Sequence, residues 1–392
     1  MIDFPALQRA NAPLNAFLDW DLNATGGTGA LAAVTVGVKA NIAVKGLPFH
    51  AGLAGLQDRI AERDAEVVSR LRAAGAVILG TLNMEEAALG SKTDNPHFGP
   101  VQNPHRIGFS PGGSSGGSGA AVAAGLCDVA LGTDTMGSVR IPAAHCGVYG
   151  FKPATGRVSQ DGLEPADSAL DAIGPLARDL DMLERAARVI SDFGEGTIQG
   201  GGAIIAGHGV TLTQPVARAF DAACDVLGRG LAQTSLGYPN ARIRFAGFIQ
   251  VSRFLAHHLS GVSDLSPHLA KLLTYGPARS AADWAEDQQI LTMVRKKMQD
   301  IVTRRGFLIM PTVPSPAFDH ADREPATQAD FTCLANIAGL PALSLPAGRT
   351  DDGMPVGVQL VCRPGDEAGL FALARQIDEG LGAYRAPPPR GE

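Results

Sequence analysis

A block of glycine and serine constrains this chain more than any other feature. Residues 103–125 read NPHRIGFSPGGSSGGSGAAVAAG, with five glycines and four serines within residues 110–119. Glycine inside a helix or strand costs about 0.5–1 kcal/mol relative to alanine, and an alanine-rich segment follows the block directly. Three interpretations are open: a phosphate-binding loop, a flexible linker, or a backbone that must pass close to a reacting group.

The spacing within the block argues against the first two interpretations. A phosphate-binding P-loop requires GxxxxGK[ST], and neither that pattern nor GxGxxG is present in the block. A linker is a poor match because the block runs without a polar spacer into a small-residue helix expected over residues 118–126. GxSxG occurs twice in the block, but a nucleophile elbow needs a strand directly before it, and QNPHRIGFSP does not predict one. A close approach to a reacting group remains.

Two further residues could carry chemistry with the serines of the block. Ser138 follows a strand expected over residues 128–132, in LGTDTMGSVRIPAAHCG, and Lys39 stands in the apolar run VTVGVKANIAVKG. Burial of a lysine disfavours the ammonium and lowers the pKa, so that the amine becomes a usable base. Each residue also has a purely structural interpretation: Lys39 as a solvated charge at a strand end, Ser114 as a turn serine, and Ser138 as a helix N-cap.

The remaining pattern predicts alternating helices and strands. A helix is expected from Asp64, as N-cap, to Gly75, with a strand over residues 76–81. Further helices are expected over residues 179–190, 216–227, 284–302 and 366–381, and further strands over 307–310 and 356–361. Apolar strands between helices indicate an α/β fold, with a mixed central β-sheet covered by helices on both faces. No linker is evident, so a single domain over residues 1–392 is expected, with residues 195–305 a less patterned, mostly helical and peripheral region.

Composition limits the partners. The net charge of −6 and the lack of a basic cluster argue against nucleic acid. No run reaches about 18 apolar residues, which argues against a membrane span, and the N-terminal residues do not resemble a secretory signal. The five cysteines contain no CxxC pair and the nine histidines no HExxH. We therefore expect a cytoplasmic protein without metal or cofactor.

Five segments resemble, in the same order, segments of the amidase signature family of serine hydrolases. The resemblance covers nearly the whole chain except its middle third, and it implies the amidase signature fold. The segments are VGVKANIAVKGLPFHAG, GTLNMEEAALGSKTDNPHFGPVQNP, SPGGSSGGSGAAVAAG, LGTDTMGSVRIPAAHCGVYGFKPATGRVS and GLPALSLPAGRTDDGMPVGVQLV.

The resemblance implies a Ser–cis-Ser–Lys triad. Ser138 matches the nucleophile, Ser114 the bridging serine that follows a cis peptide bond, and Lys39 the base. The oxyanion hole of the family is built from consecutive backbone N–H groups, here those of Thr135, Met136, Gly137 and Ser138. Supporting positions are Ser115, which resembles a serine that holds the loop, and Asp134 and Arg140, expected to form a structural pair.

The implied function is that of an amidase, which hydrolyses a carboxamide C–N bond through an acyl-enzyme on Ser138. Two residues depart from the usual family pattern: Ala40 stands where an aspartate follows the lysine, and Met136 replaces a glycine beside the nucleophile. Met136 and the low aromatic content favour a small or ureido-type amide as substrate, and the chain could form a homodimer.

Two alternatives stay open. One is the A subunit of a tRNA-dependent amidotransferase, which the larger usual size of that subunit and Met136 argue against. The other is a catalytically impaired relative with a binding or scaffold role.

Overall fold

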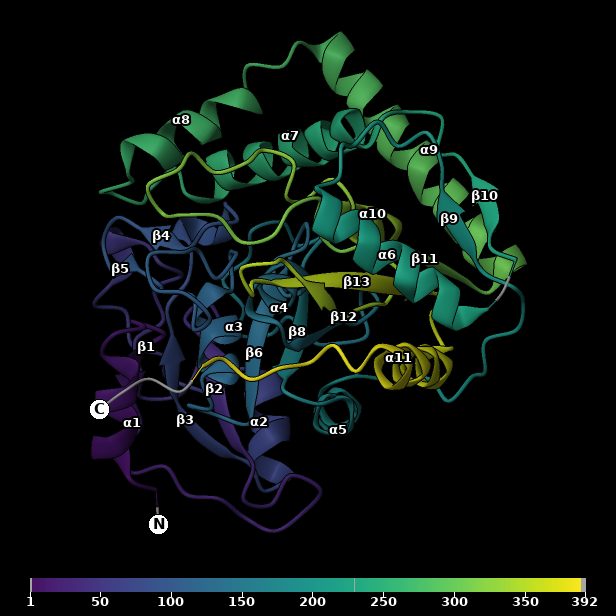
Figure 1. Cartoon of the computed structure of the whole chain (residues 1–392). Helices are drawn as coiled ribbons and strands as arrows, with labels where there is room; N and C mark the ends of the chain where they lie inside the picture. Colours follow the sequence, from purple (N-terminus) through teal and green to yellow (C-terminus); the bar gives the residue numbers. More distant parts are fainter. Residues whose placement is uncertain (1, 229, 389–392) are drawn as a thin grey trace.

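An eleven-stranded mixed sheet runs through the chain (Figure 1). The computed structural model describes residues 2–228 and 230–388. The strand order is β1-β3-β2-β6-β8-β7-β12-β13-β11-β9-β10, and β4 and β5 form a separate pair. The strands are β1 Phe17–Trp20, β2 Thr35–Lys39, β3 Val77–Leu82, β4 Asp94–Asn95, β5 Gly99–Pro100, β6 Val129–Asp134, β7 Tyr149–Lys152, β8 Ala172–Ala177, β9 Ala203–Ile205, β10 Ala232–Thr234, β11 Phe307–Pro311, β12 Ala342–Arg349 and β13 Pro355–Cys362.

Helices cover both faces of this sheet. The helices are α1 Phe4–Asn11, α2 Glu66–Ala73, α3 Gly116–Ala123, α4 Arg140–Cys146, α5 Leu180–Ile190, α6 Gln214–Leu227, α7 Asn240–His258, α8 Pro267–Tyr275, α9 Ala281–Arg305, α10 Cys333–Ala338 and α11 Glu367–Leu381, with short 3₁₀ turns η1 Ala54–Leu56 and η2 Glu86–Ala88. Apolar side chains of α2, α5, α6 and α11 pack on one face, and those of α3, α4, α9 and α10 pack on the other. The expected arrangement of helix, sheet and helix layers is confirmed.

The alternation along β11 shows why its sequence is apolar throughout. Phe307 and Ile309 pack in the cluster that contains α5, α6 and α11, whereas Leu308 and Met310 pack in the cluster that contains α9 and α10. Successive side chains of a strand point to opposite faces of the sheet. Because both faces are covered here, every position must be apolar, which gives the continuous run FLIM.

One predicted helix start is wrong. Helix α2 begins at Glu66 after Ala65, which makes no side-chain cap bond. Asp64 instead accepts a hydrogen bond from the Lys45 N–H at 2.8 Å and pairs with Arg72 at 3.0 Å. A contact between distant segments has therefore replaced the local cap. The start predicted at Asp179 is confirmed, since its carboxylate accepts from the Met182 N–H at the beginning of α5.

The less patterned region, residues 195–305, contains α6 to α9 and the last two strands at one end of the sheet, β9 and the edge strand β10. Figure 1 shows α7, α8 and α9 in green as a layer at the top of the molecule, beyond the ends of β6 and α4. The segment is mostly helical, but it is not only peripheral, because residues of α7 and α8 line the cavity described below. Within the described residues, no helix combines the length and apolar character needed to cross a membrane.

Candidate active site

Lys39 and Ser114 are hydrogen-bonded to each other inside the protein. The Lys39 Nζ lies 2.7 Å from the Ser114 Oγ and 2.7 Å from the Thr133 Oγ1, and both Lys39 and Ser114 are fully buried. The contact between Lys39 and Thr133 follows from topology, since β2 and β6 pair in parallel and therefore end at the same edge of the sheet. The alternative interpretation of Lys39 as a solvated charge is wrong.

The surroundings of Lys39 favour its neutral form. Burial lowers the pKa of Lys39 from 10.5 to about 7, although the negative charges of Asp171, Asp134 and Glu85 act in the opposite direction. Loss of hydration penalises the ammonium more than these carboxylates stabilise it. The side chain that follows is the buried methyl group of Ala40, which supplies no carboxylate. A large fraction of Lys39 is therefore an unprotonated amine at neutral pH.

The glycine and serine block passes through a crowded space. The Gly113–Ser114 peptide bond is cis. A Cβ atom on Gly113 would lie 2.8 Å from backbone atoms of Ser91 and Lys92, a separation that real side chains do not tolerate. The Ser114 carbonyl oxygen accepts from the Glu85 N–H at 3.0 Å. This close packing of backbone against backbone supports the third interpretation of the block.

Ser138 lies in a tight segment between β6 and α4. Two carbonyl oxygens of this segment accept hydrogen bonds from neighbouring residues. The Thr332 Oγ1 donates to the Met136 carbonyl oxygen at 2.7 Å, and the Ser115 N–H donates to the Ser138 carbonyl oxygen at 3.3 Å. Gly137 has φ +135°, and a Cβ there would lie 2.1 Å from the Thr332 Oγ1. The backbone N–H groups of Thr135 to Ser138 donate to no other residue that the structure describes, which leaves them free for a ligand oxygen.

The segment is anchored by a fully buried ion pair. Asp134 and Arg140 are joined by hydrogen bonds of 2.9 and 3.0 Å, and Asp134 also accepts from the Val139 N–H at 3.2 Å. Arg140 also donates to Gln359 and Asn336, at 2.7 Å each. The sequence motifs did not identify Gln359 and Asn336. The sequence signal that could have found them is that each is a single polar residue inside an apolar segment, VGVQLV for Gln359 and CLANIA for Asn336.

Ser115 and Thr133 complete the support beneath the site. The Ser115 Oγ donates to the Thr133 carbonyl at 3.2 Å and accepts from the Thr133 N–H at 3.3 Å, which ties the start of α3 to the end of β6. Thr133 was not recognised from the sequence, although its hydroxyl contacts Lys39. Helix α4 begins after Val139 without a side-chain cap bond, so Ser138 does not act as an N-cap.

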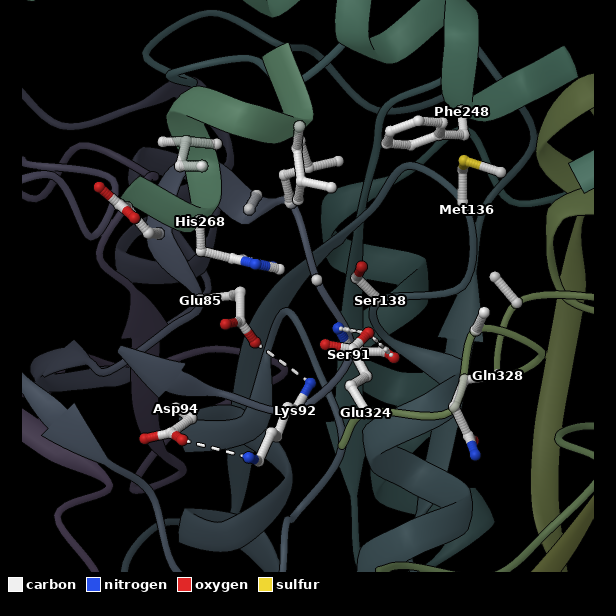
Figure 2. A pocket seen from close by; sticks show the side chains of 18 of the residues that line it. Glu85, Ser91, Lys92, Asp94, Met136, Ser138, Phe248, His268, Glu324 and Gln328 are labelled. Atoms are coloured by element: carbon white, nitrogen blue, oxygen red, sulfur yellow. Dashed lines mark hydrogen bonds and ion pairs between the residues drawn. The ribbon is translucent and has the colours of Figure 1, made fainter. Parts of the chain in front are cut away.

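Ser138 opens into a cavity of about 700 Å³. One side is apolar and is lined by Met136, Ile141, Phe248, Val251 and Leu272. The other side is lined by Glu85, Ser91, Lys92, Asp94 and Glu324. Figure 2 shows Ser138 between Met136 and Phe248 on one side and Ser91 and Glu324 on the other. Lys39 and Ser114 are not lining residues, so Ser138 is the one of these three residues that is accessible from the cavity.

A metal centre is not evident in this cavity. Across residues 2–228 and 230–388, no group of three or more His, Cys, Asp or Glu side chains could hold a metal ion. The serines and the lysine can supply a nucleophile and a base without one.

Replacing Met136 with glycine is expected to widen the cavity. Met136 packs against α7, where a Cβ on Gly247 would lie 3.1 Å from the Met136 Cε. Met136→Gly should raise kcat/KM for amides with bulky acyl groups several-fold relative to small ones, since a methylene in a pocket is worth about 1–3 kcal/mol. The measurement is the ratio of kcat/KM for large and small acyl amides. Met293→Ala, on α9 and outside the cavity, is the control, and an unchanged ratio in Met136→Gly would contradict the expectation.

Comparison with known proteins identifies relatives over almost the whole chain. The model of the Amidase family matches residues 11–195 and 259–371. The chain is 33% identical to the A subunit of glutamyl-tRNA(Gln) amidotransferase from Methanothermobacter thermautotrophicus, covering 89% of this chain and 85% of that protein. It is 35% identical to the same subunit from Anaeromyxobacter dehalogenans, covering 91% and 84%.

Solved structures with a similar fold include a protein of the same kind as these relatives. The A subunit of glutamyl-tRNA(Gln) amidotransferase from Thermotoga maritima matches with a TM-score of 0.86 and 27% identity over 99% of this chain and 94% of that one. A protein from a vestigial complex linked to the origins of an s-triazine catabolic enzyme matches with a TM-score of 0.88 and 27% identity, covering 97% and 96%. The expected fold is thereby confirmed, and the chain belongs to the amidase signature family of enzymes.

Proposed function

We propose that this enzyme cleaves the C–N bond of a carboxamide through an acyl-enzyme on Ser138. The observation that carries the proposal is the buried 2.7 Å hydrogen bond between the Lys39 amine and the Ser114 hydroxyl, next to the segment that presents Ser138 to the cavity. A serine hydroxyl is a weak nucleophile until a base removes its proton. A lysine with a pKa of about 7 is such a base at neutral pH.

The proton path of this reaction is a relay. The Ser138 Oγ attacks the carbonyl carbon while its proton passes to Ser114, and Ser114 passes its own proton to the neutral Lys39. The tetrahedral oxyanion accepts hydrogen bonds from the N–H groups of residues 135–138, and one such donor is worth about 3–4 kcal/mol. The relay then returns the proton to the leaving nitrogen, which departs as ammonia or an amine. Water attacks the ester on Ser138 by the same path and releases the acid.

The substrate class divides the proposal into two candidates. The first is an independent amidase of the cytoplasm acting on a small or ureido-type amide, as the low aromatic content and Met136 favour. The second is the A subunit of an amidotransferase, which would release ammonia from an amide donor within a larger assembly. The names of the relatives favour this second candidate more strongly than the sequence motifs did. It would have other subunits and tRNA as partners, in contrast to the expectation of no nucleic acid.

Ammonia release separates these candidates. An independent amidase releases ammonia from its amide when the purified chain is alone. The amidotransferase subunit should show a large increase in ammonia release from glutamine only when its partner subunits and acylated tRNA are added.

Reaction with a fluorophosphonate should locate the nucleophile. We expect one covalent adduct, on Ser138, because Ser138 lines the cavity whereas Ser114 is fully buried. Peptide mass spectrometry identifies the site, and Ser138→Ala should abolish labelling. An adduct on Ser114 or Ser115 would overturn the assignment of the nucleophile. Failure of the unmodified chain to react would favour a catalytically impaired relative with a binding role.

A further inference from the structure

Two carboxyl groups stand side by side on the polar wall of the cavity. Glu85 precedes η2, whereas Glu324 belongs to the segment between β11 and α10, yet both bind the same short loop. Ser91 donates to the Glu324 Oε1 from its N–H at 2.9 Å and from its hydroxyl. The next two N–H groups, of Lys92 and Thr93, donate to the Glu85 Oε2. Consecutive backbone donors therefore hold the two carboxyl groups next to each other (Figure 2).

This loop places the carboxyl pair beside the catalytic serines. The backbone of Ser91 and Lys92 packs so closely on Gly113 that a Cβ atom there would meet it at 2.8 Å. The Glu85 N–H donates to the Ser114 carbonyl oxygen at 3.0 Å. Glu85, Ser91, Glu324 and Ser138 all line the same cavity. A substrate attacked by Ser138 thus has these carboxyl groups within its own binding space.

Neither carboxyl group is neutralised by a basic side chain. Among residues 2–228 and 230–388, no lysine, arginine or histidine forms an ion pair with Glu85 or Glu324. Two of the basic side chains that line the cavity are engaged elsewhere: the Lys92 Nζ contacts Asp94 at 3.3 Å and donates to the His320 carbonyl at 2.6 Å, and Arg244 pairs with Asp330. Arg323 and His268 also line the cavity, but neither forms an ion pair with Glu85 or Glu324. A partly buried negative charge without a cation is costly unless a ligand supplies the partner.

Each carboxyl group also keeps one oxygen for a ligand. The hydrogen bonds from the described residues go to the Oε2 of Glu85 and to the Oε1 of Glu324. The opposite oxygens, Oε1 of Glu85 and Oε2 of Glu324, accept from none of those residues. Burial and the charge of Glu324 raise the pKa of Glu85 to about 8. At neutral pH Glu85 is therefore mostly protonated and its free oxygen can donate a hydrogen bond, whereas the free Oε2 of Glu324 accepts from donor groups.

We propose, resting on the function above, that Glu85 and Glu324 bind a nitrogen-rich, hydrogen-bond-donating end of the substrate. The substrate class is then a carboxamide that carries a second N–H group, either an ammonium or a ureido group, at a distance from the bond that is cleaved. The apolar wall around Met136 and Phe248 contacts the remaining hydrocarbon part. A substrate that ends in a carboxylate is disfavoured by the same pair.

Binding to a Ser138→Ala variant tests this subsite without turnover. Four amides of similar length serve as probes: 5-aminopentanamide, 3-ureidopropanamide, hexanamide and glutaramic acid. Ligand-observed NMR titrations should show that the amino or the ureido amide binds about tenfold more tightly than the other two, as expected for one hydrogen bond to a charged group. Preference for the first identifies an ammonium site, and preference for the second a ureido site.

Glu324→Gln, made in the same background, tests the residue itself. Glutamine keeps an oxygen that can accept from Ser91, so the loop is retained while the charge is lost. We expect the preference for the nitrogen-rich probe to fall by about tenfold for an ammonium and by less for a ureido group. Asp351→Asn removes an exposed charge outside the cavity, and it should leave the preference unchanged.

Two outcomes overturn the proposal. The first is that hexanamide or glutaramic acid binds as tightly as both nitrogen-rich probes, or that none of the four probes binds. The second is an unchanged preference in Glu324→Gln. Labelling of Ser138 by a fluorophosphonate is independent of these results. Labelling without a binding preference contradicts the proposed subsite but not the proposed reaction. A binding preference without labelling contradicts the proposed reaction but not the subsite.

Discussion

Lys39→Ala is expected to lower kcat by about a thousandfold and to remove the acid limb of the pH profile. Its amine is the one basic group that touches Ser114 among the described residues, at 2.7 Å, so the variant has no acceptor for the nucleophile's proton. General base catalysis contributes about 10²–10⁴-fold. The alanine side chain also leaves Thr133 without its hydrogen bond to the amine, but it removes no charge partner of an ion pair.

The direction of the pH dependence follows from the pKa of Lys39. Burial places this pKa at about 7, and only the unprotonated amine can accept a proton. Activity should therefore be low at pH 5, rise through about pH 7 and level off above pH 8. A lysine with an unshifted pKa near 10.4 would instead keep rising up to pH 10.

The measurement is kcat/KM against pH on one neutral amide, for the unmodified chain and for Lys39→Ala. Lys45→Ala is the matched control, since Lys45 is exposed on the same segment of chain and should leave both the rate and the profile unchanged. Near-normal kcat with the same acid limb in Lys39→Ala would show that another group is the base. The assignment of Lys39 to the triad would then be wrong.

The candidate catalytic positions stand out in the sequence because each belongs to a local pattern. Ser114 lies in a run of glycines that no helix or strand interior would favour, and Ser138 follows an apolar strand and a glycine. Lys39 is a single charge inside an apolar run. Such departures from the composition of ordinary elements can be detected without coordinates, and the structure places Lys39 and Ser114 in contact.

The cavity walls could not be predicted in the same way. Phe248 and Val251 lie on α7, where apolar periodicity indicates that one face is covered but not what it covers. Glu324 lies in an irregular segment between β11 and α10, and its contact with Ser91 joins residues far apart in the chain. Asp64 shows the converse: a residue typical of a helix cap was used for a contact with Arg72 instead. Tertiary contacts of this kind override local preference.

Arg140→Ala is expected to lower the free energy of unfolding by about 3–5 kcal/mol, the usual effect of removing one partner from a buried ion pair. Arg140 and Asp134 are both fully buried. Burial alone would raise the pKa of Asp134, but the charge and hydrogen bonds of Arg140 outweigh it and hold this pKa below its ordinary value. The variant would leave a charged carboxylate without its cation, and Gln359 and Asn336 would each lose a donor.

The free energy of unfolding is measured by urea denaturation, with Arg304→Ala as the control. Arg304 forms a solvent-exposed pair with Asp300 at 3.0 Å on α9, and exposed pairs contribute about 0–1 kcal/mol. Arg140→Ala should also slow the labelling of Ser138 by a fluorophosphonate, because Asp134 holds the Val139 N–H beside the nucleophile. Equal losses of stability in the two variants would contradict a structural role for the buried pair. A large loss of stability with an unchanged labelling rate in the folded fraction would mean that the pair stabilises the sheet without positioning Ser138.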